Sequence, residues 1–267
     1  MISVKNKQDC TGCYACSSVC PMAAIAMEAD SEGFWYPVMD YDRCTRCGMC
    51  MTVCPTMEAA TEGTLNESVP EAYAAYCVDE ELRLRSSSGG LFTLLAETVV
   101  GGGGVVFGAR FDEDFNVIHD YAENTEHLCR LRGSKYVQSR IGGAFRQAQE
   151  FLECGRVVMF TGTPCQISGL KYFLGQEYDS LICQDIICHG VPSPKVWQKY
   201  VTYRENCAAS ATRTIDFRRK DEGWKRFSVS FLFENNAEYV QSFHNDLYMK
   251  AFLSNICLRP SCYDCHF

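Results

Sequence analysis

The stretch CTGCYACSSVCP at residues 10–21 returns as CTRCGMCMTVCP at residues 44–55. Each copy carries four cysteines at the spacing C-x2-C-x2-C-x3-C and closes on a proline. Three thiolates on so short a loop can hold three corners of a four-iron cube, and in two-cluster ferredoxins the fourth cysteine ligates the other cluster. The spacing therefore predicts two [4Fe–4S] clusters, the first on Cys10, Cys13, Cys16 and Cys54 and the second on Cys44, Cys47, Cys50 and Cys20.

Zinc is the alternative occupant of such cysteines. Zinc ribbons pair two C-x2-C knuckles across a longer gap, and they need neither a third cysteine in the same loop nor the final proline. Residues 1–58 resemble the bacterial-type two-cluster ferredoxin fold, a module that relays single electrons. In each copy we expect the fourth cysteine to begin a helix and the proline after it, Pro21 or Pro55, to redirect the chain.

The composition favours metal-bound thiols over disulfides. The chain has 267 residues, 18 of them cysteines, and 47% of its residues are apolar. Disulfide scaffolds are typical of short secreted chains, whereas residues 1–9 hold no apolar signal segment. No stretch approaches the roughly 18 apolar residues of a membrane helix. We therefore expect a protein of the reducing cytoplasm without a membrane span, and the net charge of −8 argues against nucleic acid as a partner.

The rest of the chain reads as a polar linker at 59–72 followed by a mixed α/β domain at 73–267. Periodicity predicts strands at 72–78, 104–111, 115–121, 156–162 and 180–190, and helices at 89–100, 141–155, 163–175 and 193–206. Three further segments, 212–220, 227–235 and 237–243, are expected to form an antiparallel run.

Two turns in this second domain have the composition of ligand sites. SSSGGL at 86–91 places hydroxyls and glycines before a helix, which suits a phosphate, although this feature alone favours a plain serine N-cap. Thr161, Gly162 and Thr163 lie where a strand gives way to a helix, the usual ligand edge of an α/β sheet. The glycines at 101–104 lack a phosphate-loop ending and are expected to form a plain turn.

The remaining cysteines suggest a third cluster. Cys165 lies on the first turn of a helix, Cys188 ends an expected strand, and CYDC at 262–265 supplies a pair, so Cys165, Cys188, Cys262 and Cys265 make four thiolates. A buried apolar role is the alternative for Cys165, and we expect core or surface roles for Cys77, Cys129, Cys154, Cys183, Cys207 and Cys257. His189 and the basic residues around Trp224 are weaker candidates for redox-cofactor and phosphate contacts.

Four stretches in a fixed order then suggest a family: SSSGGLF at 86–92, RGSKYVQS at 132–139, GTPCQISGLK at 162–171 and DIICHGVPSP at 185–194. With them, the chain resembles the coenzyme F420 hydrogenase/dehydrogenase beta-subunit family, whose relatives include the plant 7-hydroxymethyl chlorophyll a reductases. The resemblance implies FAD, iron–sulfur clusters and electron exchange with a two-electron substrate, which is coenzyme F420 in deazaflavin-using members.

The resemblance also assigns residues. It implies FAD contacts at Ser87, Ser88, Gly89, Gly90, Ser134, Lys135, Tyr136, Thr161, Gly162 and Thr163, and it supports Cys165, Cys188, Cys262 and Cys265 as ligands of a cluster beside the flavin. Lys135 would supply a positive charge to a phosphate or to the reduced ring. Members of the family usually continue past the C-x2-C pair, so a chain that stops at Phe267 is expected to be truncated.

The expected function is that of an anaerobic iron–sulfur flavoprotein oxidoreductase. Its clusters would accept single electrons from ferredoxin or a redox-enzyme subunit, and the flavin converts single electrons into a hydride. Two alternatives stay open: a non-catalytic, polyferredoxin-like electron-transfer subunit of a larger redox complex, and a ferredoxin-dependent reductase of a substrate other than a deazaflavin. No catalytic side chain is assigned.

Overall fold

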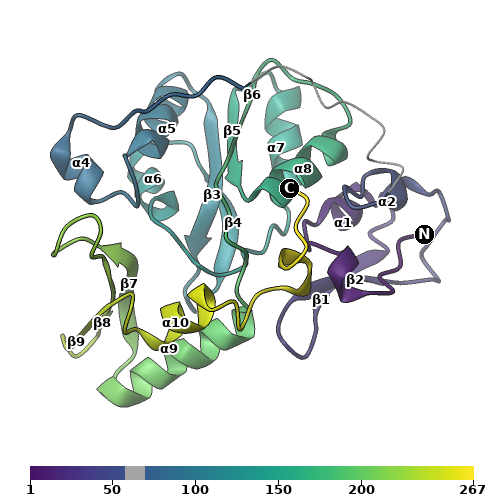
Figure 1. The fold of residues 1–267 in the computed structure, drawn as a ribbon. Helices are drawn as coiled ribbons and strands as arrows, with labels where there is room; N and C mark the ends of the chain where they lie inside the picture. Colours follow the sequence, from purple (N-terminus) through teal and green to yellow (C-terminus); the bar gives the residue numbers. More distant parts are fainter. Residues whose placement is uncertain (58–69) are drawn as a thin grey trace.

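The computed structural model describes residues 1–57 and 70–267, so residues 59–69 of the expected linker lie outside the described residues. The duplicated cysteine motifs lie on two short helices, α1 (Ala15–Val19) and α2 (Met49–Thr52), shown in Figure 1. Between them, β1 (Ile25–Ala29) and β2 (Trp35–Met39) form an antiparallel hairpin in which Ile25 pairs with Met39. A short 3-10 helix, η1 (Lys7–Asp9), precedes the first motif.

The fourth cysteine of each motif follows a helix and does not begin one, contrary to expectation. Cys20 is the residue directly after α1, and Cys54 lies two residues after α2. The residues before the two helices, Tyr14 (φ 71°) and Gly48 (φ 83°), take the left-handed conformation, so each helix starts just before the third cysteine of its motif. The proline after the fourth cysteine disfavours helical geometry at that cysteine, which is why both helices stop short of it.

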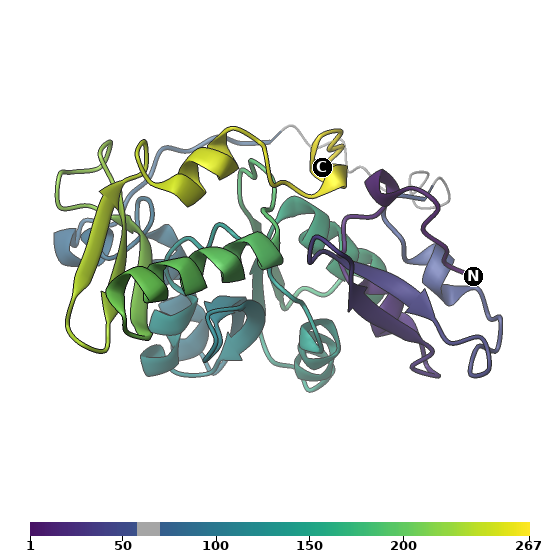
Figure 2. The ribbon, with the colours of Figure 1, turned by 90° about the horizontal axis from the view of Figure 1, so that it is seen from below.

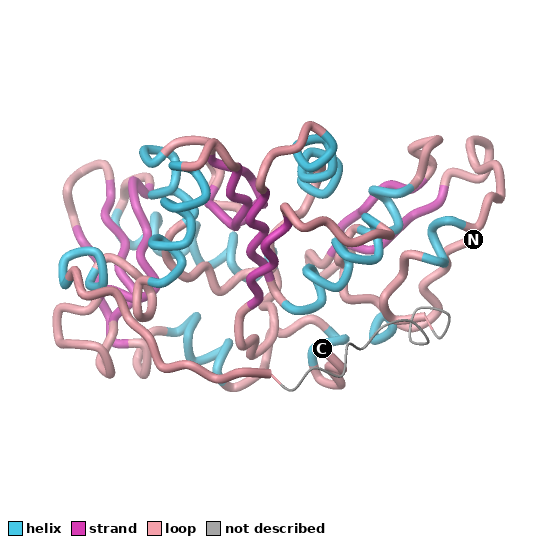
Figure 3. The backbone as a smooth tube through the Cα atoms, turned by 90° about the horizontal axis from the view of Figure 1, so that it is seen from above, coloured by secondary structure: helices cyan, strands magenta, loops and turns pink. Residues whose placement is uncertain are grey.

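A four-stranded sheet with the order β4-β3-β5-β6 forms the centre of the molecule. The strands β3 (Val105–Phe111), β5 (Val158–Gly162) and β6 (Leu181–Asp185) run parallel, and β4 (Val117–Ala122) pairs antiparallel with β3 at one edge. Because β3, β5 and β6 are parallel, the segments that follow them leave from one edge of the sheet. Figure 3 shows these strands with helices on both sides.

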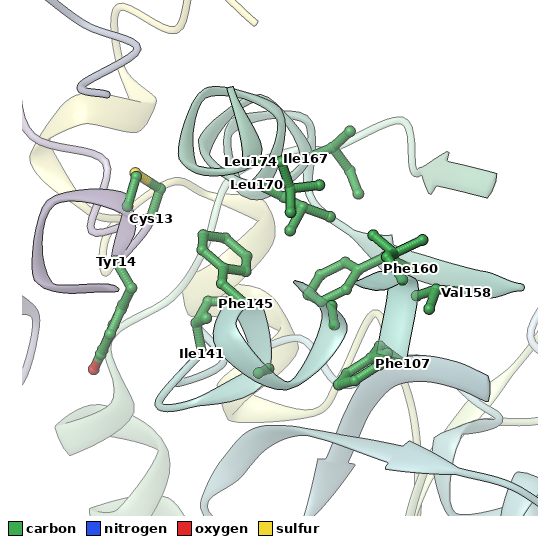
Figure 4. Packing of buried hydrophobic residues seen from close by; sticks show 14 of the residues in the cluster. Cys13, Tyr14, Phe107, Ile141, Phe145, Val158, Phe160, Ile167, Leu170 and Leu174 are labelled. Atoms are coloured by element: carbon green, nitrogen blue, oxygen red, sulfur yellow. The ribbon is translucent and has the colours of Figure 1, made fainter. Parts of the chain in front are cut away.

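Helices cover both faces of this sheet. One face packs on α5 (Leu91–Gly101) and α6 (Thr125–Leu131), and the other on α7 (Ala144–Glu153) and α8 (Pro164–Leu174). Alternation along β5 explains the two layers, since Met159 faces α5 and α6 while Val158 and Phe160 face α7 and α8. The second layer also includes Cys13, Tyr14 and Ala15, so the first cysteine motif is packed into the main core (Figure 4).

A second unit of structure completes the chain. The strands β7 (Thr212–Arg219), β8 (Ser228–Phe233) and β9 (Glu238–Ser242) form the expected antiparallel sheet. It packs with α9 (Pro194–Ala208) and α10 (Leu247–Leu253) around a buried aromatic cluster that includes Trp197, Phe217, Phe231 and Tyr248. After α10 the chain crosses back toward the cysteine motifs through the 3-10 helix η2 (Pro260–Cys262), as Figure 2 shows.

Two expected strands differ from the structure. Residues 72–76 are exposed and form no strand, because the segment has no neighbouring strand and its Cys77 N–H bonds instead to the carbonyl of Gly89 at 2.7 Å. The strand expected at 180–190 is only β6, which is part-exposed because it lies at the edge of the sheet. Ile187 beyond it is fully exposed, so Cys188 lies in a loop and does not end a strand.

Several elements that the sequence did not suggest are present: α4 (Glu80–Leu84), α6 and α10, each capped by an Asp or Asn side chain. The glycines at 101–104 form the expected turn between α5 and β3. All eighteen cysteines lie in the described part of the chain, and none of them forms a disulfide. Within the described residues, no helix has both the length and the apolar character needed to cross a membrane.

Candidate functional site

Four cysteines from both motifs gather into a first group made of Cys10, Cys13, Cys16 and Cys54. Burial raises the pKa of Cys13 to about 12, and the neighbouring thiols of Cys10 and Cys54 add to the rise. Burial likewise raises the pKa of Cys16, with a further rise from the thiols of Cys13, Cys10 and Cys54. The structure therefore brings Cys54 of the second motif beside the three cysteines of the first motif.

Backbone amides face these sulfurs. The N–H groups of Gly12, Ala15 and Ser17 bond to the thiols of Cys10, Cys13 and Cys16 respectively, and each bond lowers the pKa of its thiol against the rise from burial. Such amides stabilise negative charge on sulfur, and hydrogen bonds to sulfur are a means by which proteins tune iron–sulfur clusters. The donor set at this group therefore suits a buried, thiolate-ligated cluster.

The second group consists of Cys20, Cys44, Cys47 and Cys50. Its four cysteines line one cavity, together with the apolar side chains of Met1, Pro21, Met22, Ile25, Met39 and Met49. Two amides point at its sulfurs, since Ile2 N–H donates to Cys50 Sγ and Ala24 N–H donates to Cys20 Sγ, both at 3.3 Å. The two sequence motifs thus form two four-cysteine groups in the structure, and Cys20 of the first motif lies with the cysteines of the second motif.

The third group joins cysteines that are far apart in the sequence. Cys165 lies on the first turn of α8, Cys188 in the loop after β6, Cys262 in η2 and Cys265 just beyond it. Burial raises the pKa of Cys165 to about 11; a hydrogen bond with Thr163 Oγ1 opposes this rise, and the thiols of Cys188, Cys262 and Cys265 add to it. Val191 N–H donates to Cys262 Sγ at 3.4 Å.

None of the three groups has the geometry of a one-ion site. Among residues 1–57 and 70–267, no three His, Cys, Asp or Glu side chains converge closely enough to hold a single metal ion. The four thiols of the second group instead line one shared cavity. A four-iron cluster places its irons at separate corners of a cube, so it requires this kind of spread set of four thiols.

The helix α8 connects the first group to the third. It carries Cys165 at its start and approaches the first motif at Gly169, where an added Cβ would lie 2.9 Å from Cys13 Cβ and 3.0 Å from Cys13 Sγ. Glycine is therefore required for this close approach. Figure 4 shows Cys13 near α8, in the same core cluster as Leu170 and Leu174, and the thiol of Cys13 is within electrostatic reach of Cys165.

The SSSGG turn leaves the first turn of α5 without a side-chain cap. Gly90 is the N-cap residue with φ 84°, and no side chain bonds to the first amides of the helix. Ser86 Oγ donates to Leu82 O at 2.8 Å, whereas the buried Ser87 Oγ has no hydrogen-bond partner among the described residues. The interpretation of these serines as a plain N-cap is therefore wrong, and the helix N-terminus faces outward as an anion site would.

Basic residues gather near this turn. Lys220 Nζ donates to the carbonyls of Ser86 and Arg83 and lies 3.7 Å from the ring centre of Trp224. Two residues earlier, Arg218 Nη1 donates to Tyr136 Oη at 3.5 Å. The strand β7 and its extension thus connect the SSSGG turn to the segment that contains Ser134, Lys135 and Tyr136. The more distant Arg219 is engaged elsewhere, in ion pairs with Asp221 and Glu238.

Lys135 is a half-buried amine at this junction. Its Nζ donates to the carbonyls of Arg132 at 2.8 Å and Arg130 at 3.1 Å. Burial lowers the pKa of Lys135 to about 7, although Asp216 opposes the shift. A lysine that titrates near neutral pH can gain a proton when an anion binds beside it, because the anion restores the stability of the ammonium form.

His119, which the sequence analysis did not single out, lies beside the Thr161–Thr163 turn. Burial lowers the pKa of His119 to about 4, its Nε2 bonds to Thr161 O at 2.9 Å, and its Nδ1 is buried without a partner among the described residues. The ring stacks on Phe160 at 5.5 Å. His119 occupies the inward face of β4, and the period-two pattern of residues 115–121 could have indicated it.

The remaining candidates lie apart from this turn. His189 Nε2 bonds to Asn255 Oδ1 at 2.7 Å and its ring packs edge-on against Phe252, so its nearest partners are structural. Ser88 is exposed and Ser134 is half-buried. Gly89 packs against the backbone of Ala75 and Tyr76, where an added Cβ would come within 3.1 Å of Ala75 O.

Family models match two parts of the chain. Residues 9–57 and 36–80 match two overlapping models of a 4Fe-4S dicluster domain. Residues 155–267 match the model that describes the C terminus of the coenzyme F420 hydrogenase/dehydrogenase beta subunit. The C-terminal part of the chain, residues 155–267, is thus similar to the coenzyme F420 hydrogenase/dehydrogenase beta-subunit family. The family resemblance and the iron–sulfur nature of the N-terminal part are thereby confirmed.

A solved structure is also similar to this chain. It is a xenon derivative of the F420-reducing [NiFe] hydrogenase complex from Methanosarcina barkeri, with 18% identity and a TM-score of 0.48 over 71% of this chain. The match spans 63% of the length of that chain. No curated protein matches the sequence.

Proposed function

We propose that this protein, whose C-terminal part is similar to the F420 hydrogenase/dehydrogenase beta subunit, is an iron–sulfur flavoprotein oxidoreductase. It would take single electrons from a low-potential donor such as ferredoxin or a redox-enzyme subunit and deliver them as a pair to a small-molecule substrate, with coenzyme F420 as the first candidate. The observation that carries the proposal is the unbroken run of contacts from Cys13 through Gly169 and Cys165 to Thr163 and the turn beside His119.

Twelve cysteines are proposed as cluster ligands, four in each group: Cys10, Cys13, Cys16 and Cys54; Cys20, Cys44, Cys47 and Cys50; and Cys165, Cys188, Cys262 and Cys265. The donor chemistry fits, because each group offers four thiols with amides aimed at its sulfurs. Burial raises the pKa of Cys13 and Cys165, so these thiols would stay protonated without a metal, and a bound cluster would replace their protons. Single electrons would pass from the second group to the first and then to the third.

FAD is proposed to bind in residues 73–267, between the SSSGG turn and the Thr161–Thr163 turn. Two buried polar atoms without partners, Ser87 Oγ and His119 Nδ1, fit a polar ligand at each end of this region. The uncapped N-terminus of α5 and Lys220 suit the phosphates. When bound, a flavin supplies the conversion between one-electron and hydride chemistry. The protein's own part is to place that group beside Cys165 and to hold Lys135 where its proton responds to negative charge.

The affinity for FAD should fall as pH rises above about 7. In the free protein Lys135 has a pKa of about 7, and an anionic ligand favours its protonated form, so binding takes up a proton above that pH. The affinity is then expected to decrease by up to about tenfold per pH unit until the pKa of the complex is reached. Titration of the apoflavin protein with FAD, followed by flavin fluorescence from pH 6 to pH 9, measures this dependence.

Lys135→Met should weaken FAD binding and flatten the pH profile, whereas Lys199→Met, a control at an exposed position on α9, should leave both unchanged. An affinity in the wild type that does not vary with pH would remove Lys135 from the flavin site. Folded protein with intact clusters and no affinity for FAD would instead establish the electron-transfer subunit as the function.

A further inference from the structure

We propose that Arg259 is a buried counter-charge shared by the first and third cysteine groups. Its guanidinium would raise the reduction potential of the cluster bound by the first group. The inference rests on the proposed cluster ligands but not on FAD. Arg259 touches no substrate, and it therefore acts as a positioning residue for the two electron carriers.

Hydrogen bonds from several directions hold the guanidinium of Arg259 beside the first motif. The residue is fully buried, and its Nε donates to Cys10 O at 2.8 Å. Its Nη2 donates to Trp35 O at 2.9 Å and lies 3.7 Å from Cys10 Sγ, while Nη1 donates to Gln138 Oε1 at 3.1 Å. These contacts fix the plane of the guanidinium and place one of its nitrogens at a ligand sulfur.

The surroundings leave little room for any other arrangement. The guanidinium carbon lies 4.3 Å from the ring centre of Tyr36. Gly12 also approaches the guanidinium closely, since an added Cβ there would be 2.8 Å from Arg259 Nη1. The arginine is therefore packed between the β1–β2 hairpin and the first cysteine loop, and it holds the C-terminal segment onto the N-terminal motif.

In the part of the chain that the structure describes, no carboxylate pairs with the charge of Arg259. Burying a cation without a counter-charge is costly, even when carbonyl groups accept its hydrogen bonds. A cluster with four thiolate ligands carries net negative charge, and at the first group it would supply the missing counter-charge.

Arg259 also belongs to the third group by position. It precedes Cys262 by three residues, and its backbone N–H donates to Val191 O at 3.0 Å. The N–H of Val191 in turn donates to Cys262 Sγ. Burial raises the pKa of both Cys10 and Cys262, and in both cases Arg259 opposes the rise. The hydrogen bonds of the guanidinium reach the first group and none of the four thiols of the second group, all of which are described.

A fixed positive charge favours the reduced, more negative state of a nearby cluster and so raises its reduction potential. Arg259 would raise the potential of the first-group cluster, and to a lesser degree that of the third-group cluster, relative to the second-group cluster. An electron that arrives at the second group is then favoured to move inward. The direction of transfer between the second and the first group would then be favoured by one side chain that ligates no metal.

EPR-monitored redox titration of the anaerobic full chain tests this inference. Arg259→Met should lower the potential of the first-group cluster by about 59 mV, which corresponds to an about tenfold change in its electron-sharing constant with the second group. The second-group potential should not move, and Arg259→Lys should retain most of the wild-type value because it keeps the charge. Spectra of Cys54→Ala and Cys44→Ala assign the signals to their groups.

A first-group potential in Arg259→Met equal to that of the wild type would overturn the inference. If Arg259→Met loses the first-group iron altogether, iron content in Arg259→Lys and Arg259→Gln decides the matter. Retention in the lysine variant and loss in the glutamine variant supports a role for charge, and any other pattern contradicts it. Because the cluster potentials can be measured without FAD, failure of this inference and failure of the flavin proposal are distinguishable.

Discussion

Cys54→Ala is expected to empty the first cluster site although Cys54 belongs to the second motif. The structure places Cys54 with Cys10, Cys13 and Cys16, so its loss leaves a three-thiol group. We expect the protein to lose about four of about twelve iron atoms per chain. The proposed flavin site is built from other elements, so FAD should stay bound and dithionite should still reduce it. Reduced ferredoxin should no longer reduce it efficiently.

Rapid mixing with reduced ferredoxin measures this effect, because the bleaching of flavin bands is separable from the broad absorbance of clusters. Cys207→Ala serves as the matched control, since Cys207 is an exposed cysteine on α9 outside the three groups. Ferredoxin-driven flavin reduction at the wild-type rate in Cys54→Ala would show that the N-terminal clusters do not receive the electrons.

Cys165→Ala should produce the complementary result. It removes the proposed ligand at the start of α8, where the third group meets Thr163. We again expect a loss of about four iron atoms, while the clusters of the first two groups are retained. These two clusters should still be reduced quickly by ferredoxin, whereas onward transfer to FAD slows because the carrier beside the flavin site is gone.

The same rapid-mixing experiment separates the two phases, with cluster bleaching fast and flavin bleaching slow. Cys183→Ala is the matched control, because Cys183 lies on β6, shortly before Cys188 in the chain, but belongs to no group. Should flavin bleaching in Cys165→Ala keep pace with the wild type, the third group is not on the route, and electrons reach the flavin directly from the first group.

The sequence predicted the parts of this molecule that depend on local spacing. The two C-x2-C-x2-C-x3-C motifs predicted that the fourth cysteine of each motif, Cys20 or Cys54, joins the other motif's first three cysteines. The structure brings both residues into these expected groups. Strands and helices with clear periodicity, such as β3, β5, α7 and α8, also lie where they were expected. These features follow from residues that are close in the chain, so a local pattern contains the information.

Features that depend on long-range packing were not predicted. Residues 72–78 have strand-forming side chains but no neighbour to pair with, and only the assembled fold decides that. Nothing in the local sequence distinguishes Arg259 from an ordinary surface arginine, yet it is buried against Cys10, 249 residues earlier. The first cysteine motif was expected to belong to a module tethered by a linker, whereas Cys13 and Tyr14 lie in the core with Phe145.

The third group was predicted from the sequence only in part. Counting cysteines suggested Cys165, Cys188, Cys262 and Cys265, but the sequence could not show how a strand edge, a helix start and the C-terminal segment meet. The parallel arrangement of β5 and β6 explains how two of these cysteines meet. Both strands end at one edge of the sheet, and Cys165 and Cys188 follow them there. Arg259 and η2 bring the other two cysteines to the same place.

In the proposed function, three four-cysteine groups lead to a flavin within one chain. The most direct test is to count iron, acid-labile sulfide, zinc and FAD in one sample of the anaerobically purified full chain. The proposed sites predict about twelve iron atoms, about twelve sulfides and about one FAD, with no stoichiometric zinc. Stoichiometric zinc without acid-labile sulfide would contradict the proposed cluster sites and the electron route built on them.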